Sequence, residues 1–171
     1  QSKTDIVFVI DTTGSMAGSI AQVKASAVAT VNEVANSGTD FRIGVVTYRD
    51  VPEAPYGEAG DYQSKIELAF SSNKNTIINT INGLTLGGEG DAQESAFSAA
   101  MAGIGFPWRN GVEKAIIFYA EGAPHPIEPI TGYNILSVVA AALAVDPAEI
   151  SPILVGDSAD ARAAFQQMAA G

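Results

Sequence analysis

The sequence contains no cysteine among its 171 residues, and it contains few basic residues. Without cysteine the chain has neither a disulfide framework nor a thiolate metal site, which leaves its compartment open. Nine lysines and arginines stand against nineteen aspartates and glutamates, so the formal net charge is −10. This balance argues against nucleic acid and anionic membranes as partners, and it favours cations or a partner with a basic face.

Long apolar runs and targeting signals are missing as well. No uninterrupted apolar stretch approaches the roughly 20 residues that a membrane-spanning helix needs. The first ten residues lack the basic start and cleavage pattern of a signal peptide, so we expect Gln1 to begin a processed fragment. An extracellular or cell-surface location is favoured, and a cytoplasmic one stays open. With 47% hydrophobic residues, we expect one folded domain over residues 1–171, monomeric in isolation.

What the sequence does contain is a run of five apolar residues, 6–10, followed at once by Asp11, Thr13 and Ser15. A short unbroken apolar run suits a strand that is buried on both faces of a parallel sheet. Open α/β sheets bind their ligands at the carboxyl ends of such strands. Oxygen ligands alone suit a hard divalent cation, with Mg²⁺ favoured here over Mn²⁺ or Ca²⁺.

The rest of the chain alternates between strand-like and helix-like segments. Further strands are predicted at residues 41–48, 66–70, 115–120 and 150–155, and helices at 20–34, 73–84, 96–104, 135–145 and 157–168. This alternation predicts a doubly wound, Rossmann-like α/β fold with helices on both faces of a mostly parallel central sheet. We expect 66–70 to be one antiparallel edge strand, and Pro152 to mark the last strand as an edge too.

The order Asp-x-Thr-x-Ser after a hydrophobic strand resembles the metal-ion-dependent adhesion site of von Willebrand factor type A domains, also called integrin inserted-type domains. The similar order of elements extends this resemblance over essentially the whole chain. Three further segments resemble the hemicentin-like and bacterial branch of the family: Tyr48-Arg49-Asp50, Trp108-Arg109 and Gly122-Ala123-Pro124-His125.

The resemblance implies two further metal positions. The family usually has a threonine after a Gly-Gly pair and an aspartate after the fourth parallel strand. This sequence has Asp91 and Glu121 at the matching places. The metal site implied for this chain is therefore Asp11, Thr13, Ser15, Asp91 and Glu121. Three carboxylates would bind a cation more strongly, and they would make it less attractive to the carboxylate of an incoming partner.

Each of these residues also has a purely structural interpretation. The hydroxyls of Thr13 and Ser15 are typical helix caps. Asp91 and Glu94 have the spacing of a capping box, and Glu121 fits a solvated turn. Three other polar residues are interpreted as structural: Glu89 as a rim charge, Asp50 as a loop residue, and His125 as a loop residue at the mouth of the site.

The resemblance implies a protein-binding module that is not an enzyme. An acidic side chain of a protein partner would complete the coordination of its cation. The first alternative is an intracellular assembly module that works with an ATPase or chelatase-type partner. A metal-dependent hydrolase is less favoured. There is no Gly-x-Ser-x-Gly elbow, the loop at 87–90 lacks the Lys-Ser/Thr ending of a phosphate loop, and His125 has no evident serine and aspartate partners.

Overall fold

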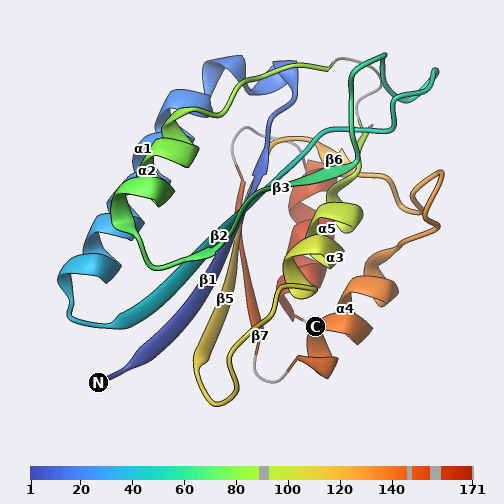
Figure 1. The fold of residues 1–171 in the computed structure, drawn as a ribbon. Helices are drawn as coiled ribbons and strands as arrows, with labels where there is room; N and C mark the ends of the chain where they lie inside the picture. Colours follow the sequence, from blue (N-terminus) through green and yellow to red (C-terminus); the bar gives the residue numbers. More distant parts are fainter. Residues whose placement is uncertain (89–92, 146–147, 155–158, 171) are drawn as a thin grey trace.

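The computed structural model describes residues 1–88, 93–145, 148–154 and 159–170. A five-stranded sheet lies at the centre, in the order β3-β2-β1-β5-β7 (Figure 1). Its strands are β1 (Lys3–Asp11), β2 (Asp40–Tyr48), β3 (Ser64–Ser71), β5 (Glu113–Ala120) and β7 (Ala148–Leu154). β3 pairs antiparallel with β2 at one edge, and the other pairings are parallel. The predicted mixed α/β sheet, with both of its edge strands, is confirmed.

Helices cover both faces of this sheet (Figure 1). They are α1 (Ile20–Asn36), α2 (Lys74–Asn82), α3 (Ala96–Ile104), α4 (Ile135–Ala144) and α5 (Ala159–Ala170). α1 and α2 lie on one face, and α3, α4 and α5 lie on the other. Each group of helices packs against the sheet over its own cluster of buried apolar side chains. Within the described ranges, no helix is long and apolar enough to span a membrane.

The central strand β1 serves both clusters because successive side chains of a strand point to opposite faces. Val7 and Val9 pack under α3 and α5, whereas Phe8 and Ile10 pack under α1 and α2. This double burial explains the unbroken apolar run in the sequence. The same alternation places Asp11 on the face of Val7 and Val9, at the carboxyl end of the strand.

Short elements adjoin the predicted ones. The 3₁₀ helix η1 (Gly14–Gly18) precedes α1, and two strands of two residues each, β4 (Gln93–Glu94) and β6 (Ala123–Pro124), pair in parallel. Elements of this length leave no periodic pattern in a sequence, so they were not predicted. The residues at the ends of two helices are typical of helix termini. Asn73 caps α2, and Gly38, with a φ of 77°, follows the end of α1.

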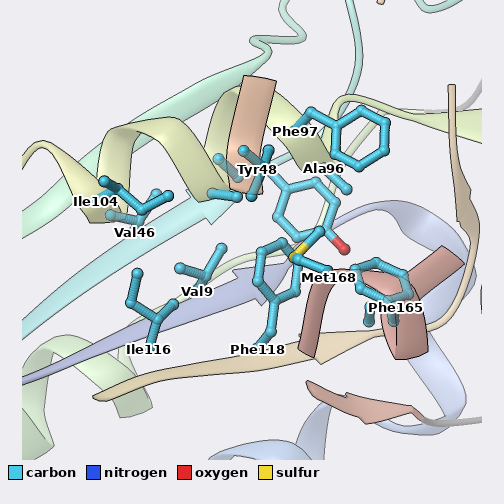
Figure 2. Close-up of a cluster of buried hydrophobic side chains, with 14 of the residues drawn as sticks. Val9, Val46, Tyr48, Ala96, Phe97, Ile104, Ile116, Phe118, Phe165 and Met168 are labelled. Atoms are coloured by element: carbon cyan, nitrogen blue, oxygen red, sulfur yellow. The ribbon is translucent and has the colours of Figure 1, made fainter. Parts of the chain in front are cut away.

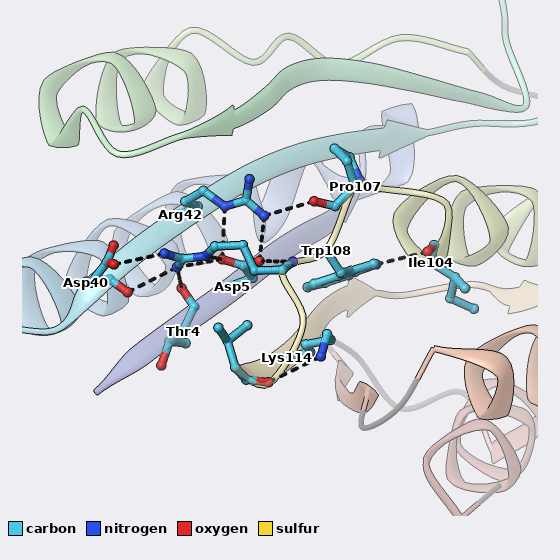
Figure 3. A network of polar contacts seen from close by, with 10 residues as sticks. Thr4, Asp5, Asp40, Arg42, Ile104, Pro107, Trp108 and Lys114 are labelled. Carbon is cyan, nitrogen blue, oxygen red and sulfur yellow. Dashed lines mark hydrogen bonds and ion pairs between the residues drawn. The ribbon is translucent and has the colours of Figure 1, made fainter. Parts of the chain in front are cut away.

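A buried aspartate, Asp5, lies near the amino end of β1 (Figure 3). Its Oδ2 accepts a hydrogen bond from Arg42 Nη2 at 2.6 Å, and its Oδ1 accepts one from Arg109 Nε at 2.9 Å. Burial raises the pKa of Asp5, but its hydrogen bonds to Arg42 and Arg109 outweigh this and leave the pKa below its usual value. Arg109, part of a segment that carried the family resemblance, thus has a structural role.

Candidate metal centre

At the opposite end of β1, the candidate ligands of the first motif converge. The Oδ1 atom of Asp11 accepts hydrogen bonds from the backbone N–H of Thr13 at 2.9 Å and from Thr13 Oγ1 at 2.6 Å. Thr13 Oγ1 lies 3.2 Å from Ser15 Oγ. Asp11 is fully buried, Thr13 is nearly so, and Ser15 is exposed. The three oxygen side chains therefore form a continuous line from the sheet to the surface.

The capping interpretation of these hydroxyls is wrong. Thr13 does occupy the N-cap position of η1, and Ser19 that of α1, but neither side chain makes a capping hydrogen bond. Thr13 turns its hydroxyl to Asp11 instead. Of the capping box suggested for Asp91 and Glu94, only Glu94 is described: it belongs to β4, and α3 begins at Ala96 with Ser95 as its N-cap residue. Asp91 itself, like Glu89, lies outside the described residues.

The second carboxylate oxygen of Asp11 has a different environment. Among the described residues, neither Asp11 Oδ2 nor Glu121 Oε2 has a hydrogen-bond partner, although both atoms are buried. Burial raises the pKa of Asp11, the Thr13 donors and the backbone N–H of Glu121 lower it, and the negative charge of Glu121 raises it again; the net shift is upward. The two carboxylates are therefore close enough to repel each other. A simple solvated turn does not describe Glu121.

The glycine pair that precedes Asp91 is hydrogen-bonded to the first motif. The N–H of Gly87 donates to Thr12 O at 3.0 Å, and the N–H of Gly14 donates to Gly88 O at 3.0 Å. Gly88 has a φ of 80°, and a Cβ built there would lie 1.9 Å from Asp61 Oδ1. Only glycine fits this turn without strain. The turn brings Gly87 and Gly88, which precede Asp91 in the sequence, beside Thr12 and Gly14 of the first motif.

The arrangement suits a divalent cation in its donor chemistry. Asp11, Thr13, Ser15 and Glu121 offer only oxygen atoms, and two buried carboxylate oxygens lack partners among the described residues. Isolated buried carboxylates are costly unless a cation or donor compensates them. Within the described ranges, no three His, Cys, Asp or Glu side chains gather in a metal-binding group. Such a group does not count the hydroxyls of Thr13 and Ser15, and Asp91 lies outside the described residues.

His125 and Asp50 lie in loops, as expected, but neither is a solvated loop residue. Both are buried, and His125 Nε2 lies 2.9 Å from Asp50 Oδ2. Ser95 Oγ donates to Asp50 Oδ1 at 2.9 Å. A histidine with serine and aspartate neighbours is thus present after all. However, Asp50 lies between the other two, whereas a nucleophilic triad needs the histidine in the middle, next to an accessible serine. Ser95 is fully buried.

Tyr48 is a polar residue near the site that sequence reasoning missed. It ends β2 beside Asp11, with which it is paired in register. Its hydroxyl is buried and has no hydrogen-bond partner among the described residues. Burial raises the pKa of Tyr48 well above its usual value, and the charges of Asp11 and Glu94 raise it further. In the sequence it is simply the aromatic end of a buried strand.

Comparisons with known proteins agree with this geometry. The family model described as von Willebrand factor type A domain matches residues 5–171. Two solved structures of proximal thread matrix protein 1 from the mussel byssus superpose with TM-scores of 0.61 and 0.66, at 13% and 15% identity. The second is described as having a zinc-occupied MIDAS motif. Each match covers 98% of this chain, and this chain spans 39% of the length of each of the two solved chains. No curated protein matches significantly.

Proposed function

Because the chain belongs to the von Willebrand factor type A domain family, we propose that it is a protein-binding module whose binding depends on a divalent cation. Domains of this family mediate protein interactions, often through a metal, and a solved relative holds zinc at its metal-binding motif. The observation that carries the proposal is the pair of buried, unpartnered oxygens, Asp11 Oδ2 and Glu121 Oε2, among the described residues.

We propose that Asp11, Thr13, Ser15, Asp91 and Glu121 hold the cation, with Mg²⁺ favoured over Mn²⁺ or Ca²⁺. Bound there, the cation would supply a positive charge and an open coordination position to a ligand. Thr13 and Ser15 would contribute hydroxyl oxygens, and Asp11 would orient Thr13 through the hydrogen bond between them. Asp91, in place of the usual threonine, supports assignment to the hemicentin-like and bacterial branch.

The partner that fits this site is a protein with an acidic side chain, as the family resemblance implies. The domain carries a formal charge of −10, so a partner carboxylate is attracted only where the cation reverses the local potential. Binding should therefore depend steeply on the cation. We propose no catalysis, because the His125–Asp50–Ser95 group has its aspartate in the middle and is buried.

The test is an array of immobilised peptides that each carry a single glutamate, paired with the same peptides carrying glutamine. We expect the domain to bind a subset of the glutamate peptides in Mg²⁺ or Mn²⁺, and to lose that binding in EDTA or after Glu→Gln replacement in the peptide. Binding that is equal in EDTA, or equal for glutamine peptides, would contradict the proposed mode of recognition.

The Gly88→Ala variant should weaken cation binding at least about tenfold, a loss typical of residues that support metal ligands. Gly88 has a positive φ and lies against the Asp61 carboxylate, so alanine must strain the turn that bonds to Gly14 and displace Asp61. Gly111→Ala is the matched control, since Gly111 has a φ of 68° and open space around it. Both variants should lose about 1 kcal/mol of stability. Only Gly88→Ala should change the affinity in a calorimetric Mn²⁺ titration; equal affinities would refute the role of this turn.

A further inference from the structure

Tyr48 packs in the hydrophobic core and is paired in register with Asp11 of the candidate metal centre. Its ring packs against Phe118, with the ring centroids 5.4 Å apart, in the cluster that also contains Phe165 and Met168 (Figure 2). Its backbone carbonyl accepts a hydrogen bond from Thr12 N at 3.1 Å. The strand that ends in Tyr48 is thus fixed directly beside the strand that ends in Asp11.

Three neighbouring strand ends each present a buried oxygen atom without a hydrogen-bond partner among the described residues. These atoms are Tyr48 Oη on β2, Asp11 Oδ2 on β1 and Glu121 Oε2 directly after β5. β1 lies between β2 and β5 in the sheet. Buried polar groups are nearly always satisfied in folded proteins, and a buried tyrosine hydroxyl usually finds a partner. Among the six such atoms in the described residues, these three are the oxygen atoms at the ends of adjacent central strands, and this placement points to one shared ligand.

The second fully buried tyrosine shows the ordinary situation. Tyr119 belongs to the opposite cluster, and its hydroxyl lies 3.0 Å from Ser26 Oγ on α1. The hydroxyl of Tyr119 therefore has a hydrogen-bond partner within the protein and needs no ligand. Both tyrosines lie near the carboxyl ends of strands of the same sheet, but only the hydroxyl of Tyr119 has a hydrogen-bond partner among the described residues. Tyr119 is therefore a matched control for Tyr48.

We propose that the Tyr48 hydroxyl is part of the cation site, where it hydrogen-bonds to a cation-bound water that also reaches the free oxygen of Asp11. This inference rests on the proposed function. A phenol hydroxyl both donates and accepts, and Mg²⁺ keeps several of its waters when it binds to proteins. Tyr48 is a positioning residue: it holds a water of the cation's hydration shell, and it does not ligate the cation itself.

The test replaces each tyrosine with phenylalanine, which removes one hydroxyl and keeps the ring. Calorimetric titration with MgCl₂ and MnCl₂ measures cation affinity, and urea unfolding in EDTA measures the stability of the metal-free domain. Tyr48→Phe should weaken cation binding about tenfold or more, as other residues around metal ligands do. Its metal-free stability should stay the same or rise, because an unpaired buried hydroxyl is removed. Tyr119→Phe should lose metal-free stability and keep the wild-type affinity.

The outcomes separate this inference from the proposed function. If the wild-type domain binds neither cation, the proposed function fails, and the role of Tyr48 fails with it. If the wild type binds but Tyr48→Phe binds within twofold as tightly, the metal site stands and Tyr48 has no part in it. If Tyr48→Phe loses metal-free stability as Tyr119→Phe does, its hydroxyl serves the fold and the inference is overturned.

Discussion

Replacing Asp11 with alanine should abolish the stabilisation of this domain by divalent cations. A ligand at 100 times its dissociation constant stabilises a folded protein by about 2.7 kcal/mol. For a domain of this size each kcal/mol moves the unfolding midpoint by about 2–4 °C. The wild type should therefore unfold roughly 5–11 °C higher in Mg²⁺ than in EDTA. The variant should show no difference, because it lacks the carboxylate that orients Thr13 and faces Glu121.

The metal-free Asp11→Ala variant should stay within about 1 kcal/mol of the wild type. It loses two hydrogen bonds from Thr13, each worth about 1 kcal/mol. It also loses a buried charge whose pKa is raised mainly by burial. A raised pKa in the folded state means that the contribution of Asp11 to stability is present below its unfolded pKa and is lost as the pH rises through the folded value. At neutral pH the two effects oppose each other. A cation-dependent shift that survives in this variant would contradict the assigned site.

Replacing Asp5 with alanine should have the opposite signature, a large loss of stability that cations do not alter. Asp5 is fully buried at the other end of β1, where Arg42 and Arg109 both bond to it. Removing one partner of a buried ion pair costs about 3–5 kcal/mol, and we expect about 3 because both arginines are partly exposed. Urea unfolding should give the same loss in EDTA and in Mg²⁺.

The pH dependence of this loss follows from the lowered pKa of Asp5. A carboxyl whose pKa is lower in the folded state contributes stability above its unfolded pKa, and that stability is lost as the pH falls through the folded value. The difference in the free energy of unfolding between wild type and Asp5→Ala should therefore become smaller on acidification below about pH 4. Asp40→Ala is the control: Asp40 is more exposed and pairs with Arg109 at 3.0 Å, so its loss should stay below about 1 kcal/mol. Equal losses from Asp5 and Asp40 would refute this account.

Much of the fold was predictable because it rests on patterns of local sequence. The unbroken apolar run of β1 predicted a central strand, and burial on both faces confirms it. Pro152 marked an edge strand, and β7 is an edge strand. The paired strands β4 and β6 escaped prediction because two residues carry no periodicity. Their pairing depends on segments some thirty residues apart, which no local pattern encodes.

The candidate site was predictable only where its residues are close in sequence. Asp11, Thr13 and Ser15 follow one strand, so their spacing alone placed them together, and the hydrogen bond between Asp11 and Thr13 agrees. The burial of Asp50 against His125 joins loops 75 residues apart. Tyr48 belongs to a segment that carried the family resemblance, but nothing in the sequence marked its hydroxyl, because an aromatic residue is ordinary in a buried strand. The ligand role of Glu121 stays a prediction, and that of Asp91 lies outside the described residues.

A calorimetric titration of the wild-type domain with Mg²⁺ and Mn²⁺, after dialysis against EDTA, tests the central claim most directly. The account predicts saturable binding of one cation per chain, at a site where Asp11 Oδ2 and Glu121 Oε2 are available as ligands or water acceptors. Binding of one equivalent, absent in Asp11→Ala and retained in Asp5→Asn under conditions where that variant is folded, would support it. The absence of saturable binding by any of Mg²⁺, Mn²⁺ and Ca²⁺ would contradict it.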